Sequence, residues 1–448
     1  MTVDTVLYNG KIFVNGKLLE AGIAINEEKI YRIAKTPNLP QASRKMNLDG
    51  KIVIPGLIDV HVHLRDEGKA YKEDFHTGTL AAAAGGVTTV LDMPNNRPIT
   101  MDIYTLKERM RLTRGRIFVN VGFYSAFPEN SMEIPLLVKE GVIGFKLFLN
   151  AQIGGINVEN DETLLEMLQT LSRAGVPLAV HAEDKRLIEK KKEELQKMGR
   201  HDFQAYIEAH PPKAEEKAVK RMVELTKKTD AQVHFCHVSS EKGLEVVRKA
   251  KNDGLLVTCE VTPHHLLLSA EDLEEYGAFA VTTPSLRTKQ NVEALWKGLK
   301  NGWVDILASD HAPHSIKEKT ANSIWKIKPG ISGIETFLPL MLNEVNSGRL
   351  TLEELVKLTS ENPAKVFQLK FRGLLKEGFY ADLTIIDIHA EYRIDASKFY
   401  SKAKYSPFNG WRIKGKPIKT FVNGELVMED GEITAKPHTG KLVRRGYP

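Results

Sequence analysis

The sequence predicts an α/β protein, a (β/α)8 TIM barrel with a small composite β-sandwich domain built from both ends of the chain. Eight apolar, strand-like runs in the middle of the chain alternate with amphipathic helical segments, which is typical of a parallel sheet covered by helices. Short strand-like runs with Asn-Gly turns open and close the chain. We therefore expect the composite domain at residues 1–54 and 368–448 and the barrel at residues 55–367.

Length and composition are compatible with this fold. A chain of 448 residues that is 42% hydrophobic can bury a large core without disulfides. The two cysteines, Cys236 and Cys259, exclude a disulfide framework and favour a reducing compartment. The N-terminus lacks a signal-peptide pattern, and no apolar stretch is long enough to span a bilayer. We expect a soluble cytoplasmic protein that does not act at a membrane.

The charge balance bears on the kind of partner. The net charge of +6 comes from 63 basic and 57 acidic residues that are spread along the chain. This mild excess is compatible with a small anionic substrate and is poor evidence for binding to nucleic acid. The sequence leaves open a homodimer or an association with other enzymes of the same pathway.

The two ends of the chain have matching patterns. Strand-like runs occupy residues 6–14 and 22–34 near the N-terminus, and residues 382–388 and 420–433 near the C-terminus. Asn-Gly pairs at both ends favour hairpins. We expect these runs to join in one small antiparallel domain, with the barrel inserted between them.

The barrel strands follow one another at regular spacing. Helical patterns lie between them, for example at residues 161–175 and 211–229, and the Lys- and Glu-rich residues 184–194 are expected to be a solvated helix face. A dinucleotide-binding sheet is the alternative, but no glycine fingerprint opens a helix after the first strand. The eight strands are expected at residues 56–65, 87–95, 116–125, 142–150, 177–183, 231–239, 255–265 and 304–313.

Side chains that could bind a metal gather at the C-terminal ends of these strands, which form the catalytic mouth of a barrel. His61 and His63 are two residues apart on the first strand, so they point to the same face. Imidazole and carboxylate donors suit Zn²⁺, with Mn²⁺ or Co²⁺ as substitutes. Later strands deliver one candidate each: Lys146, His181, His237 and Asp310.

Each candidate also has an ordinary structural explanation. A lone strand histidine such as His181 is commonly a hydrogen-bonded core residue. Lys146 would extend to the surface or form an ion pair, and Asp310 would cap a helix. Six ligand-type residues that all lie at strand ends are hard to explain separately. Their joint occurrence therefore favours a metal site.

Seven segments carry a resemblance to the cyclic amidohydrolases. They occur in the family order and cover nearly the whole chain, and within the family they resemble the dihydroorotases most closely. The segments are PGLIDVHVHLR (55–65), MPNNRP (93–98), GFKLF (144–148), HAED (181–184), HFCHVSS (234–240), EVTPHHLLL (260–268) and ASDHAPHSIKEK (308–319).

The resemblance implies two Zn²⁺ ions per subunit, one held by the histidines of the first strand and one by those of the fifth and sixth strands. Lys146 would be carboxylated and bridge the two ions, because a carbamate offers two anionic oxygens where a protonated lysine offers none. Asp310 would complete the first site and act as general base and then acid. Carbamate, Asp310 and a hydroxide offset three of the four positive charges, so the site suits an anionic substrate.

The resemblance also implies substrate contacts. Arginine can grip a carboxylate with two hydrogen bonds, which neutral rings cannot exploit. An ion pair of Arg65 with Asp66 or Glu67, a turn role for Asn95 and a loop role for His314 are the alternatives. The implied contacts are Arg65 and Asn95 to the substrate carboxylate, His314 to the substrate, and the backbone of Pro329 and Gly330 to the ring.

Two features bear on the choice between a dihydroorotase and its relatives. Thr283 stands where an asparagine usually contacts the substrate, and one hydroxyl cannot reproduce the donor and acceptor of an amide. Lys146 is a bridge that allantoinases and dihydropyrimidinases share, whereas many dihydroorotases use an aspartate. Dihydroorotase activity, which interconverts N-carbamoyl-L-aspartate and (S)-dihydroorotate in pyrimidine biosynthesis, is the expected function. An allantoinase, a hydantoinase or dihydropyrimidinase, and a non-catalytic scaffold are the alternatives.

Overall fold

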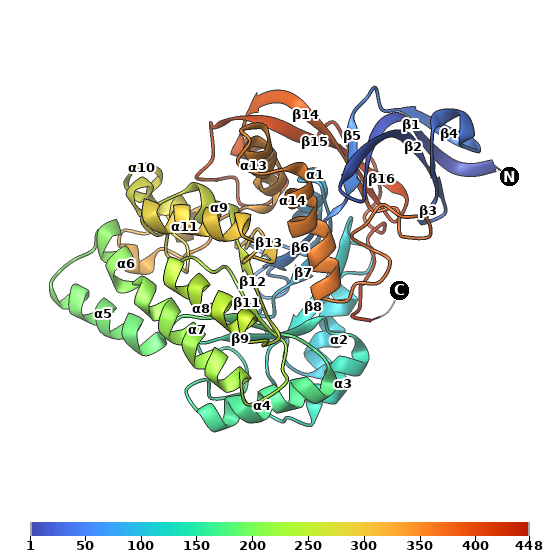
Figure 1. Ribbon diagram of the computed structural model, residues 1–448. Coiled ribbons are helices and arrows are strands. Elements are labelled where there is room, and N and C mark those ends of the chain that lie inside the picture. The colour runs from blue at the N-terminus through green and yellow to red at the C-terminus, as the bar shows by residue number, and fades with distance from the viewer. Residues whose placement is uncertain (1, 447–448) are drawn as a thin grey trace.

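The computed structural model describes residues 2–446, and Figure 1 shows a helix-covered barrel beside a curved sheet that combines strands from the N-terminal and C-terminal parts of the chain. The sheet has nine strands in the order β17-β16-β15-β14-β5-β1-β2-β3, with β4 paired to β1. Its strands are β1 (Thr2–Val14), β2 (Lys17–Asn26), β3 (Lys29–Ala34), β4 (Gln41–Asn47), β5 (Ile52–Pro55), β14 (Leu383–Arg393), β15 (Arg412–Val422), β16 (Glu425–Glu429) and β17 (Glu432–Ile433).

Strands from the two chain ends meet where β14 pairs antiparallel with β5. The sheet is not antiparallel throughout, because β1 pairs in parallel with both β4 and β5. Alternation of apolar residues fixes which face of a strand is buried, but it does not fix the direction of its neighbour. The sheet extends to Pro55, one residue past the expected boundary, and the division of the chain into two domains stays a prediction.

The barrel contains all eight expected strands. They form a parallel sheet in sequence order from β6 to β13. The ends of this sheet meet where Val62 pairs in parallel with His311, and the amide of His63 donates to the carbonyl of His311 at 2.9 Å. The strands are β6 (Leu57–Val62), β7 (Val87–Asp92), β8 (Asn120–Ser125), β9 (Gly144–Phe148), β10 (Leu178–His181), β11 (Val233–Phe235), β12 (Val257–Val261) and β13 (Ile306–Leu307).

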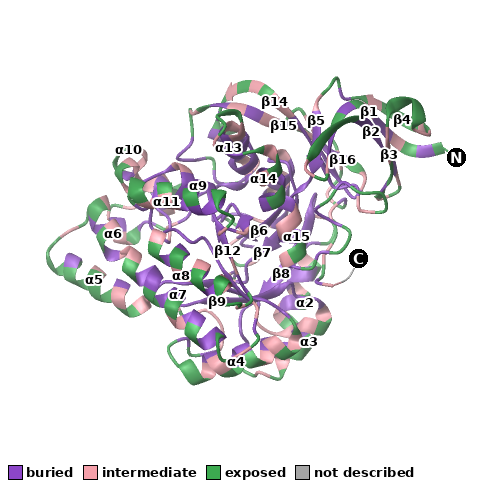
Figure 2. Ribbon diagram, viewed as in Figure 1, coloured by how far each residue is buried: buried purple, intermediate pink, exposed green. Residues whose placement is uncertain are grey.

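Helices surround the barrel, and Figure 2 shows their buried faces turned toward it. The expected helices at residues 161–175 and 211–229 are confirmed as α4 and α7. The main helices are α1 (Phe75–Ala84), α2 (Ile103–Leu112), α3 (Glu133–Glu140), α4 (Asp161–Ala174), α7 (Pro212–Thr226), α8 (Glu241–Asn252), α11 (Lys289–Lys300) and α13 (Ile334–Asn346).

Shorter helices lie mostly in the connections. The Lys- and Glu-rich segment is confirmed as a largely exposed helix, α5. The other α-helices and single turns are α6 (Phe203–Ala209), α9 (Pro263–Leu267), α10 (Leu273–Tyr276), α12 (Ile316–Lys319), α14 (Leu352–Val356), α15 (Asn362–Val366), η1 (Thr36–Asn38), η2 (Ala270–Asp272), η3 (Gly277–Ala280), η4 (Ile324–Lys326), η5 (Lys357–Glu361) and η6 (Ala396–Lys398), with α5 spanning Lys185–Lys197.

Two apolar clusters hold the barrel together. The larger one lies between the strands and the helices and includes Val90, Leu147 and Val219. The smaller one contains side chains of strands around the barrel, such as Val60 and Ala179, together with Phe367. Among residues 2–446 no helix is long and apolar enough to cross a membrane.

Candidate active site at the mouth of the barrel

The two histidines of β6 and Asp310 converge on one point. Oδ1 of Asp310 lies 3.3 Å from Nε2 of His61 and 3.2 Å from Nε2 of His63. All three side chains are buried. A register shift between Asp59 and Val62 adds a residue to β6 at this point, and such bulges re-aim side chains near active sites. Asp310 has a φ of 44° and does not precede a helix, so the helix-cap explanation is wrong.

The opposite ring nitrogens of these histidines are also occupied. Nδ1 of His63 lies 2.8 Å from Oδ1 of Asn95, and Nδ1 of His61 contacts Glu260 on β12. Glu260 also lies 3.0 Å from Nε2 of His234 and accepts from the backbone amide of His237 at 3.1 Å. Burial alone would raise the pKa of Glu260, but the charges and hydrogen bonds of His61 and His234 hold it far below its usual range.

The second pair of histidines forms a similar arrangement. Nδ1 of His181 lies 3.0 Å from Nε2 of His237, and the rings of His237 and His61 have centroids 5.2 Å apart. Lys146 on β9 is fully buried, and its Nζ contacts Sγ of Cys236 at 3.0 Å. It forms no ion pair with any carboxylate in residues 2–446, so the ion-pair explanation for Lys146 is wrong. The structure thus brings together all six expected ligand residues.

These residues fit the expected metal centre. His61, His63 and Asp310 each offer a ligand atom within 4.8 Å of the others, so the three could hold a metal ion together. Burial, with a smaller effect of nearby positive charges, holds the pKa values of His63 and His237 well below their usual range. Neutral imidazoles are the form that binds metals, and each ring here has a second polar group behind it, except for the unpartnered Nδ1 of His237.

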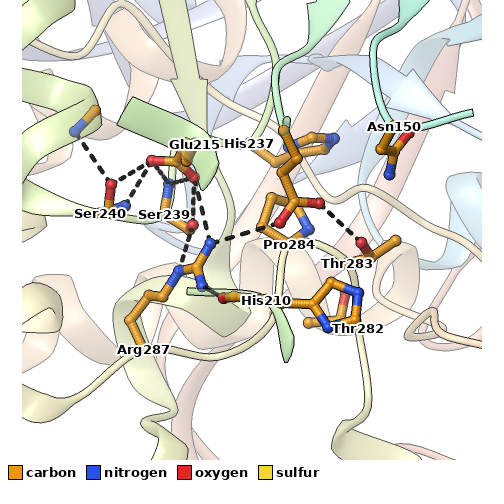
Figure 3. Close-up of polar contacts among 12 residues, drawn as sticks. Asn150, His210, Glu215, His237, Ser239, Ser240, Thr282, Thr283, Pro284 and Arg287 are labelled. Atoms are coloured by element: carbon orange, nitrogen blue, oxygen red, sulfur yellow. Dashed lines mark hydrogen bonds and ion pairs between the residues drawn. The ribbon is translucent and has the colours of Figure 1, made fainter. Parts of the chain in front are cut away.

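Behind His181 lies a buried ionic network that the sequence did not reveal. Nε2 of His181 lies 2.8 Å from Glu183, and the hydroxyl of Thr283 donates to the same oxygen at 3.0 Å. Figure 3 shows Arg287 between Glu215 and the backbone of His210. Burial would raise the pKa of Glu183, but the hydrogen bond and charge of His181, with smaller effects of His210 and Arg287, lower it to about 2. The HAED segment contains Glu183, but spacing alone does not show what it contacts.

Arg65 follows β6 and lies beside the expected metal ligands. It is buried with a φ of 63°, its Nε has no hydrogen-bond partner, and it forms no ion pair within the described part of the chain. Asp66 pairs instead with Arg116 at 2.8 Å, so the surface ion-pair explanation for Arg65 is wrong. A buried guanidinium without a carboxylate is energetically costly and is suited to receive one from a ligand.

Two further lysines surround this guanidinium. Nζ of Lys69 donates to the backbone oxygen of Asn95 at 2.6 Å, and Nζ of Lys72 pairs with Glu318 at 2.8 Å and lies 3.0 Å from Nδ1 of His314. Burial and the neighbouring cations, Arg65 first among them, lower the pKa of Lys69 to about 8. His314 is buried, so the surface-loop explanation for this histidine is wrong.

The backbone near Pro329 and Gly330 is held by groups of the protein itself. Nε2 of His314 lies 3.0 Å from the Pro329 carbonyl. Lys319 is fully buried and donates to the carbonyls of Val281, Lys328 and Gly330 at 3.0–3.1 Å. Burial lowers the pKa of Lys319 to about 7. The segment that the resemblance assigns to the substrate ring is therefore fixed by His314, which the sequence singled out, and by Lys319, which it did not.

The remaining predicted substrate contacts, Asn95 and Thr283, each already bind another side chain of the protein. Asn95 contacts His63 through its oxygen, which leaves its amide nitrogen available, and Thr283 is bonded to Glu183. His265, which follows β12, contacts Thr262 and the carbonyl of Pro284. Neither the metal ligands nor the substrate contacts are tested by the fold itself, so their roles stay predictions.

Comparison with known proteins places the chain in a family. Residues 52–427 match the amidohydrolase family, and the chain belongs to it. The chain is 36% identical over 445 residues to the dihydroorotase of Pyrococcus furiosus, covering 98% of this chain and 97% of that protein. It is 38% identical over 415 residues to the dihydroorotase of Methanothermobacter thermautotrophicus, covering 93% and 92% of the two chains.

Hydantoinases are relatives as well. The L-hydantoinase of Paenarthrobacter aurescens is 34% identical over 452 residues, which is 99% of each chain. Among solved structures, the L-hydantoinase (dihydropyrimidinase) from Arthrobacter aurescens has a TM-score of 0.95 at 33% identity and covers 99% of this chain and 100% of its own. The resemblance to cyclic amidohydrolases and the barrel fold are thereby confirmed.

Proposed function

We propose that this protein is a dihydroorotase, a hydrolase that interconverts N-carbamoyl-L-aspartate and (S)-dihydroorotate in pyrimidine biosynthesis. The observation that carries the proposal is Arg65, a buried guanidinium beside the metal ligands that has no carboxylate partner within residues 2–446. Dihydroorotate has a carboxylate on its ring, whereas hydantoin, dihydrouracil and allantoin have none. A small anionic substrate therefore supplies what Arg65 lacks.

The residues at the strand ends have proposed roles in this reaction. His61, His63 and Asp310 would hold one Zn²⁺ and His181 and His237 the other, with carboxylated Lys146 between them. When bound, two divalent ions polarise the ring carbonyl and lower the pKa of a water molecule.

The proton is handled by the protein. Asp310 would accept it from the attacking water and return it to the ring nitrogen as the C–N bond breaks, acting as base and then as acid. Its position supports this role, because Oδ1 faces both histidines of β6 and the carboxylate is buried. Ring closure uses the same steps in reverse.

Substrate orientation would come from the residues around the metal ligands. Arg65 would bind the carboxylate with the free amide nitrogen of Asn95, and His314 would contact the substrate from the side of Pro329 and Gly330. A cytoplasmic location belongs to the same proposal, since both cysteines are free and buried, as in proteins of reducing compartments.

A hydantoinase is the second candidate, because Thr283 replaces the usual asparagine and the fold matches an L-hydantoinase with a TM-score of 0.95. The experiment is a turnover assay of the purified protein with dihydroorotate, hydantoin, dihydrouracil and allantoin, together with metal analysis. We expect two metal ions per chain and turnover of dihydroorotate far above that of the neutral rings. A preference for a neutral ring would overturn the dihydroorotase proposal and favour the second candidate.

A further inference from the structure

The two ring nitrogens of His181 face different partners. Nδ1 lies 3.0 Å from Nε2 of His237, on the side of the expected metal centre. Nε2 lies 2.8 Å from Oε2 of Glu183 and 2.7 Å from the amide nitrogen Nδ2 of Asn150. A histidine binds a metal only through a nitrogen that carries no proton. The position of the proton on the His181 ring therefore decides whether Nδ1 can bind the metal.

Glu183 and Asn150 differ in what they can impose on this ring. An amide can turn either its oxygen or its nitrogen toward Nε2, so Asn150 adapts to either tautomer. An ionised carboxylate can only accept a hydrogen bond. Glu183 therefore keeps the proton on Nε2 and leaves the lone pair of Nδ1 directed toward His237.

Glu183 is itself held in place by the loop that follows β12. Glu183 is fully buried. The hydroxyl of Thr283 donates to its Oε2 at 3.0 Å, and Nη2 of Arg287 lies 3.7 Å from its Oε1. Neither Oε1 of Glu183 nor Nη2 of Arg287 has a hydrogen-bond partner among the described residues. The two groups therefore stabilise each other through their opposite charges and not through a hydrogen bond.

Arg287 is anchored by residues that follow β10 and β11. Its Nε donates to Oγ of Ser239 at 3.0 Å, and its Nη1 donates to the carbonyl of His210. Glu215 accepts from the backbone amides of Ser239 and Ser240, at 3.1 Å and 2.9 Å for its two oxygens, and lies 3.8 Å from Nη2 of Arg287 (Figure 3). Loops after β10, β11 and β12 are thus joined in one network behind His181.

We propose that Glu183 is a positioning residue that sets the tautomer of His181 for the second metal ion, and that Thr283 and Arg287 hold Glu183 in that position. The proposal rests on the metal centre of the proposed function and extends it. Thr283 lies on the segment that the resemblance assigns to substrate contact. The same hydroxyl therefore links the substrate loop to the second metal ion, which explains how a threonine serves where an asparagine is usual.

The test measures metal binding and does not depend on the identity of the substrate. The apoprotein is titrated with Zn²⁺ alone, and the variants Glu183→Gln and Asn150→Ala are compared with the unmodified chain. Both variants alter a group that contacts the same ring nitrogen, so Asn150→Ala is the matched control. Circular dichroism and thermal unfolding establish that each variant is folded.

We expect Glu183→Gln to bind one Zn²⁺ as the unmodified protein does and to bind the second about 10–100-fold more weakly, the usual effect of losing a carboxylate behind a ligand histidine. Asn150→Ala should change the second affinity by less than about threefold, because the carboxylate still fixes the tautomer. Equal weakening in both variants, or unchanged binding in Glu183→Gln, would overturn the inference while the dihydroorotase proposal stands. An unmodified protein that binds no Zn²⁺ would overturn both.

Thr283 gives a second and milder test in case Glu183→Gln does not fold. Thr283→Val keeps the shape and removes the hydroxyl, and it should weaken the second Zn²⁺ by about 3–10-fold, less than the loss of the carboxylate itself. Thr283→Ser keeps the hydroxyl and should restore the affinity of the unmodified protein. Equal affinities in the valine and serine variants would show that the hydroxyl does not hold Glu183 for metal binding.

Discussion

Two regions of the barrel mouth differ in the charged groups that contact them. We call the six strand-end residues His61, His63, Lys146, His181, His237 and Asp310 the metal floor, and Arg65, Lys69, Lys72 and Lys319 the cationic rim. The carboxylates Asp310, Glu260 and Glu183 contact three of the floor histidines. In the rim, by contrast, Lys72 pairs with Glu318, whereas Arg65, Lys69 and Lys319 form no ion pair within residues 2–446.

The difference indicates what each region binds. Histidines that are neutral and supported by carboxylates suit metal cations. Buried or half-buried cations without carboxylates suit an anion, because burial without a counter-charge is costly. A ligand that satisfies both regions has a group that two metal ions can polarise and a carboxylate a short distance away. The following predictions test this division, from the largest expected effect to the smallest.

Removal of the lysine in the metal floor should have the largest effect. Lys146→Ala leaves the two metal sites without a bridging group, so we expect loss of bound metal and a fall in kcat of roughly 10³-fold or more. Short carboxylic acids in bicarbonate-free buffer should restore part of both, because they supply two oxygens to the space that Lys146 leaves. Metal analysis and activity on the same samples check this. Two tightly bound metals in Lys146→Ala would contradict the carbamate assignment.

Loss of the rim guanidinium should affect anionic substrates alone. Arg65→Met keeps the bulk of the apolar stem and removes the charge, and it should cost about 2–5 kcal/mol in kcat/KM for dihydroorotate, the scale for breaking a buried charge pair. For neutral cyclic amides, kcat/KM should fall much less. Metal content should be unchanged, since Arg65 is not an expected ligand. If every substrate slows equally, Arg65 does not bind the carboxylate.

The carboxylate behind His61 should matter for the metal floor and not for substrate choice. Glu260→Gln removes the charge that contacts His61 and His234, and we expect metal affinity to fall about 10–100-fold. The ratio of activities on dihydroorotate and on neutral rings should stay the same. Isothermal titration with Zn²⁺ and the four-substrate assay measure the two quantities. If Glu260→Gln changes the substrate ratio and leaves the metal affinity normal, Glu260 acts on substrate choice and not on the metal floor.

Lys69 should give the rim a pH dependence. Its pKa of about 8 means that a rise in pH through this value removes a positive charge, so KM for dihydroorotate should increase above pH 8. Lys69→Met should raise KM about 3–10-fold at pH 7, a modest loss since the side chain is only half-buried, and should remove the dependence. Lys69→Arg should keep KM low above pH 8. Steady-state kinetics between pH 7 and pH 9 measure this dependence of KM on pH. An unchanged pH profile in Lys69→Met would show that Lys69 does not contribute its charge to substrate binding.

The smallest effect is expected at Thr283. An asparagine amide can still donate to Glu183 while it presents its oxygen to the substrate, so Thr283→Asn should change KM for dihydroorotate by less than about threefold relative to the unmodified enzyme. Kinetics and a Zn²⁺ titration on one preparation are sufficient. A loss above about tenfold would show that the site requires the shorter side chain.

Much of the molecule could be predicted from local sequence patterns. Eight apolar runs separated by helical patterns indicated the barrel because strands buried on both faces must be apolar throughout. His61 and His63 were expected on one face because side chains in a strand alternate with period two, and their rings lie 5.3 Å apart. The strand ends also placed Lys146, His181, His237 and Asp310 at one mouth, since parallel strands in a barrel share their direction.

The tertiary structure alone decided which side chains support these residues. Glu183 and Thr283 are 100 positions apart in the chain, and Glu260 meets His61 across 199 positions, so no local pattern links them. The three carbonyls that Lys319 binds and the parallel pairing of β1 with β4 likewise depend on how distant loops and strands meet. Periodicity follows from the geometry of one element, whereas the partner of a buried polar group follows from the packing of several.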